Sequence, residues 1–347
     1  MGIVRDVTVA QLDDFDEIID VRSPAEFTDD HIPGAISAPV LDDEERARIG
    51  TLYKQESPFV AKKAGAALIA RNIARHLETQ FADRPKRWRP LVYCWRGGQR
   101  SGAMAHILAQ IGWSVGKLHG GYKAYRHHVL EELDRLPPLF DFRVICGPTG
   151  SGKSRLLLAL ASQGSQVLDL EVLAQHRGSL LGKLPGQDQS AQRMFETRIW
   201  NELRHFDAAE PVFVEAESRK IGNLCLPDTL LERMRAGQCL TLQAPLESRV
   251  ALLMEDYRHF LAEPQALMTE LERLTPLQGR QRIEAWRSLV EQGDWEALVG
   301  DLLLQHYDPA YGRSTSHNFG AAAPQRLELH DLRDATLSNV ARQLSPR

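Results

Sequence analysis

The eight residues Gly147-Pro148-Thr149-Gly150-Ser151-Gly152-Lys153-Ser154 restrict the fold of this chain more than any other segment. The spacing Gly-x4-Gly-Lys-Ser is that of a loop whose backbone N–H groups surround a phosphate, and such a loop joins a strand to a helix. Residues 143–146 fit a short buried strand, and residues 154–161 have the apolar spacing of a helix. The segment therefore predicts a strand–loop–helix unit of an α/β domain with a parallel sheet.

The composition of this loop suits a phosphate-bearing ligand. Its glycines let backbone N–H groups approach phosphate oxygens, Lys153 adds a positive charge, and the Ser154 hydroxyl can reach a Mg²⁺ ion. The pattern predicts phosphate or diphosphate binding without specifying ATP, and we expect no firmly bound cofactor. The expected binding residues are Gly147, Thr149, Gly150, Ser151, Gly152, Lys153 and Ser154.

Charged side chains follow two further strands, which we expect at residues 166–168 and 212–215. Phosphate-binding domains place functional carboxylates after such strands, and the alternative is a set of solvated strand ends. His176-Arg177-Gly178 forms another polar cluster after the first strand, and its alternative is a surface turn. The candidate residues of this second-domain site are Asp169, Glu171, Glu215, Glu217 and the phosphate- or RNA-binding pair Arg219 and Lys220.

A second functional segment precedes this domain and reads Cys94-Trp95-Arg96-Gly97-Gly98-Gln99-Arg100-Ser101. The apolar run at residues 91–93 predicts a strand before it, and residues 101–111 predict a helix after it. Loop N–H groups, the helix N-terminus and two arginines favour an anion there, and they favour the thiolate form of a cysteine. We expect Cys94 to be a catalytic nucleophile within an anion-binding loop, and the alternative is a buried cysteine that ends a strand.

Two runs of alternating strands and helices predict two α/β domains. In the first run, strands are expected at residues 18–21, 35–38, 91–93 and 115–118, and helices at residues 61–79, 101–111 and 122–133. In the second run, further strands are expected at residues 240–242 and 325–329, and a helical region at about residues 247–306. Pro137 and Pro138 cannot continue a helix. We therefore expect a first domain at residues 1–135, a linker at 136–141 and a phosphate-loop domain at 142–347.

Composition excludes several classes of protein. The four cysteines include no Cys-x-x-Cys pair, which argues against a disulfide scaffold and a zinc site and suits a reducing cytosol. No apolar run approaches the roughly 18 residues that span a bilayer, and no signal-peptide core follows Met1. We expect a cytoplasmic protein without a membrane segment, and nothing in the sequence predicts its oligomeric state.

The formal net charge of −4 means that binding to nucleic acid depends on local basic segments. One expected helix carries four basic residues, and a compact basic run near residue 87 contains a tryptophan that can stack on a base. The alternative for each is a solvated face. The candidate residues are Lys62, Lys63, Arg71, Arg75, Lys86, Arg87, Trp88 and Arg89, with Arg280, Arg282 and Arg287 in the later helices.

The first domain resembles the rhodanese family. The resemblance rests on Asp20-Val21-Arg22-Ser23-Pro24-Ala25-Glu26-Phe27, on His31-Ile32-Pro33-Gly34-Ala35 and on Gly120-Gly121-Tyr122. It implies that Cys94 is the loop cysteine, which in rhodaneses carries sulfur or selenium. The usual rhodanese loop has four residues between cysteine and arginine, whereas this loop has five, as in cysteine phosphatases. The larger loop suits a tetrahedral, phosphate-sized anion and leaves phosphatase chemistry open for the first domain alone.

The whole chain resembles the tRNA 2-selenouridine synthase family, in which a rhodanese-like domain precedes a phosphate-loop domain. Further matching segments are Asp169-Leu170-Glu171, His176-Arg177-Gly178-Ser179 and Phe213-Val214-Glu215-Ala216-Glu217-Ser218-Arg219-Lys220-Ile221-Gly222. The resemblance implies a transferase that S-geranylates wobble 2-thiouridine of tRNA with geranyl diphosphate. Selenium from selenophosphate, made by a separate supplier, then replaces the geranylthio group.

Within that resemblance, our hypothesis assigns geranyl diphosphate to the phosphate-binding loop and selenophosphate to the Cys94 loop. Cys94 either carries selenium covalently or acts only in the displacement step. The main competing hypothesis is a small-molecule kinase with a sulfur-carrying or phosphatase-like first domain. A phosphatase that uses Cys94 and a non-catalytic RNA-binding module are two further hypotheses.

Overall fold

The computed structural model describes residues 2–179, 181–182, 186, 188–318 and 325–345. Its contacts group the chain into two compact units. Unit 1 comprises Met1–Glu132 and Ala191–Asn201, and unit 2 comprises Leu133–Ser190 and Glu202–Arg347. The segment Ala191–Asn201 thus packs with the first unit although it lies within the second half of the sequence.

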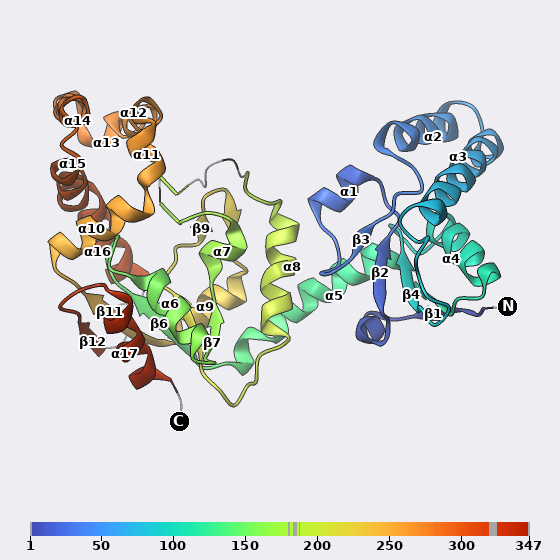
Figure 1. Cartoon of the computed structure of the whole chain (residues 1–347), viewed down its shortest axis with the longest axis horizontal. Coiled ribbons are helices and arrows are strands. Elements are labelled where there is room, and N and C mark those ends of the chain that lie inside the picture. Colours follow the sequence, from blue (N-terminus) through green and yellow to red (C-terminus); the bar gives the residue numbers. More distant parts are fainter. Residues whose placement is uncertain (1, 180, 183–185, 187, 319–324, 346–347) are drawn as a thin grey trace. The chain divides into compact units, whose positions relative to one another are not determined.

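Unit 1 is built on a five-stranded parallel sheet with the strand order β1-β5-β4-β2-β3 (Figure 1). The strands are β1 (Val4–Val7), β2 (Glu17–Asp20), β3 (Ile36–Ser37), β4 (Pro90–Tyr93) and β5 (Val115–Leu118). Strand β4 is central and buried along its whole length, as expected for a strand covered on both faces. The chain leaves this central strand directly at Cys94.

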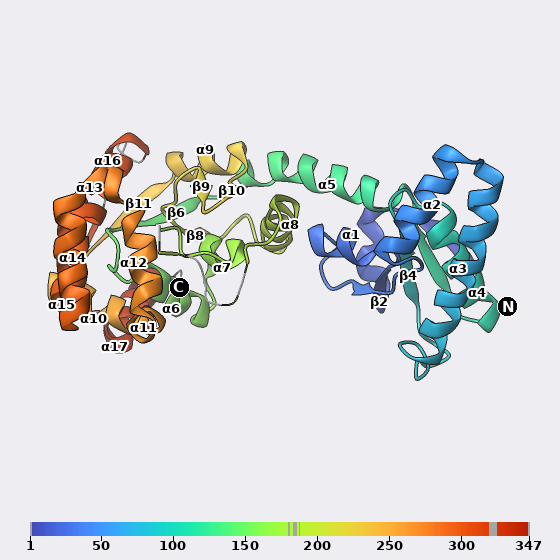
Figure 2. The same ribbon diagram turned by 90° about the horizontal axis from the view of Figure 1, so that it is seen from above.

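Helices cover both faces of this sheet. In Figure 2, α2, α3 and α4 lie on one side of β2 and β4, and α1 lies on the other. Local signals set their ends, because Asp42 caps α2 through the Glu45 N–H and Ser57 caps α3 through the Val60 N–H. The helices are α1 (Pro24–Asp29), α2 (Asp43–Gln55), α3 (Pro58–Glu78), α4 (Gln99–Ile111), α5 (Gly121–Arg135) and the added α8 (Gln192–Leu203), with a 3-10 turn at Val9–Asp14.

Unit 2 contains a second five-stranded parallel sheet with the order β12-β11-β6-β8-β7. Its strands are β6 (Phe142–Cys146), β7 (Gln166–Leu168), β8 (Val212–Glu215), β11 (Gln238–Gln243) and β12 (Gln325–Glu328), and β9 (Lys220–Ile221) pairs with β10 (Leu224–Cys225) in a separate hairpin. Strand β6 lies between β11 and β8, so the loop that follows it leaves the middle of the sheet. Because the strands are parallel, β6, β7 and β8 all end on this edge.

The helices of unit 2 fall into two sets (Figure 2). One set packs on the sheet, and the other forms a helical group at one end of the unit. The first set is α6 (Lys153–Ser162), α7 (Leu170–Ala174), α9 (Asp228–Ala236) and α17 (Asp334–Leu344). The second is α10 (Leu246–Asp256), α11 (Arg258–Ala262), α12 (Pro264–Glu272), α13 (Thr275–Gln278), α14 (Arg280–Gln292), α15 (Trp295–Leu302), the π-helical turn η3 (Leu303–Tyr307) and α16 (Asp308–Asn318). Trp286 on α14 is fully buried at the centre of this group.

The predicted α/β class, with a helical C-terminal part, is confirmed, and all nine expected strands form. The sequence patterns did not reveal β1, the β9–β10 hairpin or the helices α1, α2, α7, α8 and α9. The expected boundary at residues 136–141 contains a single 3-10 turn, Pro137–Leu139, between α5 and β6. Among the described residues, no helix is long and apolar enough to cross a membrane.

Candidate functional site

The Cys94 loop connects the buried end of β4 to the N-terminus of α4. The Sγ atom of Cys94 is 3.2 Å from the Oγ atom of Ser101, on the first turn of α4. Both side chains are buried. The predicted strand–loop–helix arrangement is therefore present, with the helix N-terminus directed at the segment that begins with the thiol.

Two glycines allow the loop to pack against the start of α5. Gly97 has φ +66°, and an added Cβ would lie 2.6 Å from the Leu118 carbonyl oxygen. Gly121 has φ +60°, and its Cβ would lie 2.2 Å from the Cys94 carbonyl oxygen. The Tyr122 N–H donates to that same carbonyl at 2.8 Å. The Gly120-Gly121-Tyr122 motif thus packs directly against the backbone of the Cys94 loop.

The two arginines of the loop have different surroundings. Arg96 is exposed. Arg100 is half-buried and donates to the Glu26 carboxylate at 2.8 Å, and Arg46 donates to the same carboxylate at 3.0 Å. Burial opposes the charge of Glu26, but the hydrogen bond and positive charge of Arg100 prevail and hold the pKa of Glu26 below its ordinary value. The Glu26 carboxylate therefore fixes the position of the Arg100 guanidinium within the Cys94 loop.

The segment around Arg22, another part of the rhodanese-like signature, forms a buried hydrogen-bond network within unit 1. Buried Arg22 forms a bidentate pair with Asp20, donates to the Asp30 carbonyl and lies 3.9 Å over the ring of Tyr122. Burial opposes the guanidinium charge, but the Asp20 carboxylate outweighs it and raises the pKa of Arg22. The Tyr122 hydroxyl donates to Asp30 at 2.7 Å. This network ties β2 and α1 to the helix that supports the Cys94 loop.

The phosphate-binding loop of unit 2 runs from β6 into α6, as predicted. Gly147, Gly150 and Gly152 have positive φ values, a conformation that favours glycine. Lys153 Nζ donates to the carbonyl oxygens of Gly147 and Pro148 at 2.8 and 3.4 Å. Its pKa is lowered by burial, and the negative charges of nearby Glu171 and Glu217 partly compensate. The half-buried ammonium group is therefore held against the backbone of the loop, between the Gly147 and Pro148 carbonyls.

Three residues outside the phosphate-binding loop support it, and the sequence patterns did not reveal them: Arg249, Asp308 and Tyr311. Arg249 on α10 donates through Nε and Nη2 to the Thr149 carbonyl at 3.0 and 2.8 Å, and it pairs with Asp308 at 2.6 Å. The hydroxyl of Tyr311 accepts the Gly147 N–H. These residues lie about a hundred positions or more along the chain from the loop, so no local motif could reveal them.

The four predicted carboxylates of unit 2 meet at the same edge of the sheet. Ser154 Oγ donates to Glu171 Oε2 at 3.3 Å, and the Glu171 N–H donates to Glu215 Oε1 at 2.8 Å. Asp169 caps α7 by accepting the Val172 N–H at 3.0 Å. Oε2 of Glu215 is buried without a hydrogen-bond partner among the described residues.

Burial and mutual repulsion shift the titration of this acidic cluster. Burial, then the nearby Glu171 carboxylate, raises the pKa of Glu217 to about 8. Burial, then the charges of Asp169 and Glu171, raises the pKa of Glu215 well above its ordinary value. Clusters with such raised pKa values are typical of sites that bind cations or transfer protons.

The other predicted residues of unit 2 are the pair Arg219 and Lys220 and the cluster His176-Arg177-Gly178. Arg219 is exposed and pairs with Asp228 at 2.9 Å, and Lys220 is exposed on the β9–β10 hairpin. Gly178 of the His176-Arg177-Gly178 cluster lies against Glu171 and Glu217, because its added Cβ would be 2.9 Å from each carboxylate. That cluster belongs to the site.

Most basic candidates of unit 1 lie on its surface, and their contact with tRNA stays a prediction. Lys62, Lys63, Arg71 and Arg75 are exposed on α3, and Lys86 and Arg87 are exposed before β4. Arg89 is exposed and pairs with Asp16. Trp88, however, is 5% exposed and packs between the rings of Phe81 and Trp113. The expectation that its ring stacks on a base is corrected, because the tryptophan belongs to the core.

A large groove in unit 1 lies between α2, α3 and the start of α4, with about 1910 Å³ of empty space counted out to solvent. Gln99 and Arg100 of the Cys94 loop form one border. Its basic lining residues are Arg46, Lys54, Lys62 and Arg100. Arg46 and Arg100 are paired with Glu26, so Lys54 and Lys62 are the lining cations that this carboxylate does not neutralise.

Comparison with known proteins matches both parts of the chain. The family model for the tRNA 2-selenouridine synthase AAA domain matches residues 140–278, and that for the rhodanese-like domain matches residues 6–128. A curated tRNA 2-selenouridine synthase from Nitrosomonas europaea is 38% identical over 244 residues, covering 69% of this chain and 63% of that protein. One from Marinobacter nauticus is 32% identical over 327 residues, covering 85% and 87%. One from Alcanivorax borkumensis is 31% identical over 335 residues, covering 87% and 90%.

Proposed function

The chain belongs to the tRNA 2-selenouridine synthase family, and on that premise we propose that it replaces the sulfur of wobble 2-thiouridine in tRNA by selenium. The observation that carries the proposal is the presence of two separate strand–loop–helix segments suited to anions, each at the end of a strand in the middle of a parallel sheet. One loop begins with a buried thiol, and the other holds a lysine. Two loops suit a reaction with two anionic co-substrates, geranyl diphosphate and selenophosphate.

The first step is assigned to the phosphate-binding loop. The sulfur of 2-thiouridine attacks C1 of geranyl diphosphate, the C–O bond breaks, diphosphate leaves with the electron pair, and the uridine N3 proton is released. Lys153 and the loop N–H groups stabilise the charge that develops on the leaving diphosphate. Alkylation converts the sulfur into a better leaving group for the second step.

A Mg²⁺ ion that arrives with the diphosphate fits the residues present. The Ser154 hydroxyl and the Glu171 carboxylate lie 3.3 Å apart, and Mg²⁺ in such sites uses one or two protein oxygens together with phosphate oxygens. The ion would neutralise charge on the leaving group. Ser154 and Glu171 are the residues that would hold it.

The second step is assigned to the Cys94 loop, which suits the oxyanion of selenophosphate. Hydrolysis of the P–Se bond yields phosphate and hydrogen selenide, the selenide attacks C2 of the base, and geranylthiolate leaves. This path conserves electrons, whereas a Cys–S–Se bond made from selenophosphate would require an oxidant to remove two electrons. We therefore assign Cys94 to the displacement step and not to a covalent selenium carrier, with its Sγ atom held 3.2 Å from the Ser101 hydroxyl.

The tRNA substrate requires a cationic surface near the reacting loop. The groove between α2, α3 and α4 offers Arg46, Lys54, Lys62 and Arg100 beside the Cys94 loop. Phosphate contacts of this kind supply affinity and position the nucleic acid. The groove supports a site for the tRNA backbone next to the site of selenium transfer.

Mass analysis of tRNA nucleosides after incubation with both co-substrates, each omitted in turn, tests the proposal. Omission of geranyl diphosphate, or Lys153→Ala, should leave 2-thiouridine. Omission of selenophosphate, or Cys94→Ser, should accumulate the S-geranylated nucleoside.

Four results would contradict parts of this scheme or favour a different function. Geranylation without selenation by Lys153→Ala would overturn the assignment of co-substrates to loops, and full 2-selenouridine formation by Cys94→Ser would remove Cys94 from the reaction. ATP turnover that depends on Lys153 but not on tRNA would favour a small-molecule kinase. Turnover of aryl phosphates by Cys94 would favour a phosphatase.

A further inference from the structure

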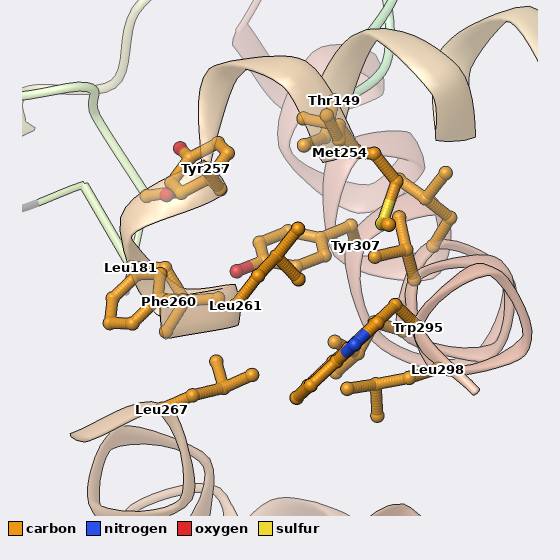
Figure 3. A pocket seen from close by; sticks show the side chains of 15 residues that line it. Thr149, Leu181, Met254, Tyr257, Phe260, Leu261, Leu267, Trp295, Leu298 and Tyr307 are labelled. Atoms are coloured by element: carbon orange, nitrogen blue, oxygen red, sulfur yellow. The ribbon is translucent and has the colours of Figure 1, made fainter. Parts of the chain in front are cut away.

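An apolar pocket in unit 2 is not used by the steps described so far. It is bordered by α10, α11, α12, α15 and η3 (Figure 3). Most of its lining side chains are aliphatic, phenyl or thioether groups, among them Leu253, Met254, Leu267 and Val299. The lining residues that carry a polar atom in the side chain are Thr149, Ser179, Tyr257, Trp295 and Tyr307.

Thr149 joins this pocket to the phosphate-binding loop. It is the third residue of the loop, and its carbonyl is held by Arg249 from α10, the same helix that provides Leu253 and Met254 to the lining. In Figure 3, Thr149 lies at one side of the pocket, and Trp295 and Leu267 lie at the opposite side. A ligand whose anionic end occupies the loop therefore has an apolar space directly beside it.

The loop around His176-Arg177-Gly178-Ser179 forms another border. Gly178 faces Glu171 and Glu217 of the acidic cluster, and the next residue, Ser179, lines the pocket. Arg177 donates to the Asp256 carbonyl at 2.8 Å and lies 4.8 Å over the ring of Tyr257, and Arg177 itself is not a lining residue. The pocket thus borders the charged site at two points, Thr149 and Ser179.

The polar atoms of the lining are largely engaged with one another. The hydroxyl groups of Tyr257 and Tyr307 both interact with Ser179, and burial raises the pKa of both tyrosines and keeps them neutral. A nucleobase in this space would lose hydrogen bonds to water without replacing them, which is costly. A hydrocarbon chain has no such requirement, and its burial is favourable.

We propose that this pocket holds the isoprenoid chain of a prenyl diphosphate whose diphosphate group occupies the Gly147–Ser154 loop. Trp295 and Leu267 then lie at the far end and limit the chain length. This inference rests on the proposed function, because it names the part of the protein that selects the geranyl group. The pocket gives binding energy to a part of the substrate remote from the reacting carbon.

Calorimetric titration of the full chain with inorganic diphosphate, geranyl diphosphate and farnesyl diphosphate tests this inference. Since each buried methylene is worth about a fourfold gain in affinity, geranyl diphosphate should bind at least about 100-fold more tightly than diphosphate. Val299→Phe should remove most of that ratio while diphosphate still binds as in the wild type. Trp295→Ala should shift the preference towards farnesyl diphosphate.

Leu304→Phe is the matched control, because Leu304 is 51% exposed and is not a lining residue. It should leave all three affinities unchanged. Equal affinity of the wild type for diphosphate and geranyl diphosphate would overturn the inference, as would a ratio unchanged by both Val299→Phe and Trp295→Ala. An affinity gain of ATP over diphosphate that Val299→Phe abolishes would make this a nucleobase pocket and would also overturn it.

Failure of the inference is distinct from failure of the proposed function. A wild-type protein that transfers geranyl to tRNA but shows no chain-dependent affinity contradicts the pocket alone. A protein that binds geranyl diphosphate with the predicted ratio but transfers neither geranyl nor selenium contradicts the function alone.

Discussion

Arg249 holds the Thr149 carbonyl of the phosphate-binding loop with two N–H donors, across a hundred residues of sequence. The same guanidinium forms a close pair with Asp308, which begins α16. Because Thr149 also lines the apolar pocket, this contact fixes the point where the anionic and apolar parts of the site meet.

Replacing Arg249 by Met should impair the site more than the fold. The variant leaves the Asp308 carboxylate without its partner, which should cost about 1–3 kcal/mol of stability, measured by denaturant unfolding. The KM for geranyl diphosphate should rise at least about tenfold because the loop carbonyl is released. The double variant Arg249→Met/Asp308→Leu should recover stability but not KM. Recovery of both would show that Arg249 contributes only to folding.

Removing the hydroxyl next to the thiol should affect only the second step. Ser101→Ala should lower the rate of selenium incorporation by about 10- to 100-fold, since the Cys94 thiol loses its hydrogen-bond partner at 3.2 Å. Geranylation should be unchanged. The alkylation rate of Cys94 against pH, followed by peptide mass analysis, should also change. Gly102→Ala, whose Cβ would meet open space, is the control. An unaltered Cys94 alkylation profile in Ser101→Ala would exclude this role.

The acidic cluster makes stability depend on pH. The pKa of Glu217 is raised from 4.5 to about 8, chiefly by burial, so between these values the folded protein retains a proton that the unfolded chain has lost. This contribution to stability is complete below about pH 4.5 and is lost as the pH rises towards 8. Glu217→Gln should therefore flatten the fall in the free energy of unfolding between pH 5 and 8, measured in urea. Exposed Glu291→Gln should leave the fall unchanged, and a slope retained by Glu217→Gln would refute the assignment.

The basic groove beside the Cys94 loop should contribute to tRNA affinity. Lys54→Ala/Lys62→Ala removes two lining cations and should reduce the slope of log K against log salt by up to about 2. Filter binding at several salt concentrations measures this slope. Exposed Arg342 on α17 provides a control, since Arg342→Ala should bind tRNA as the wild type does. An unchanged slope for the double variant would remove the groove from the tRNA site.

The exposed pair Lys86 and Arg87 provides an independent test of the basic segment before β4. Lys86→Ala/Arg87→Ala should weaken tRNA binding and flatten its salt dependence, whereas substitution of buried Trp88 should destabilise unit 1 instead. Binding assays and thermal unfolding distinguish the two effects. Salt-independent loss of binding by the double variant would argue against direct phosphate contacts.

Much of the fold could be predicted because strand-end motifs are local. The order strand, Gly-containing loop, helix at Cys94 and at Gly147 is encoded within about a dozen residues, and glycines with positive φ permit those turns. By contrast, β1 and α2 were missed: β1 is short and largely exposed, and α2 has no buried residues, so neither has a strong apolar pattern.

The sequence by itself determined that this protein has two strand–loop–helix segments on two parallel sheets, one with a thiol and one with a lysine, and it predicts that both bind anions. Only the tertiary structure decided which distant side chains complete them: Arg249 and Tyr311 at one loop, Glu26 at the other, and the apolar pocket beside Thr149. It also decided that Trp88 is a core residue and that Ala191–Asn201 packs with unit 1. The physical reason is that a loop's conformation depends on neighbouring backbone, whereas burial and long-range pairing depend on how separate helices pack.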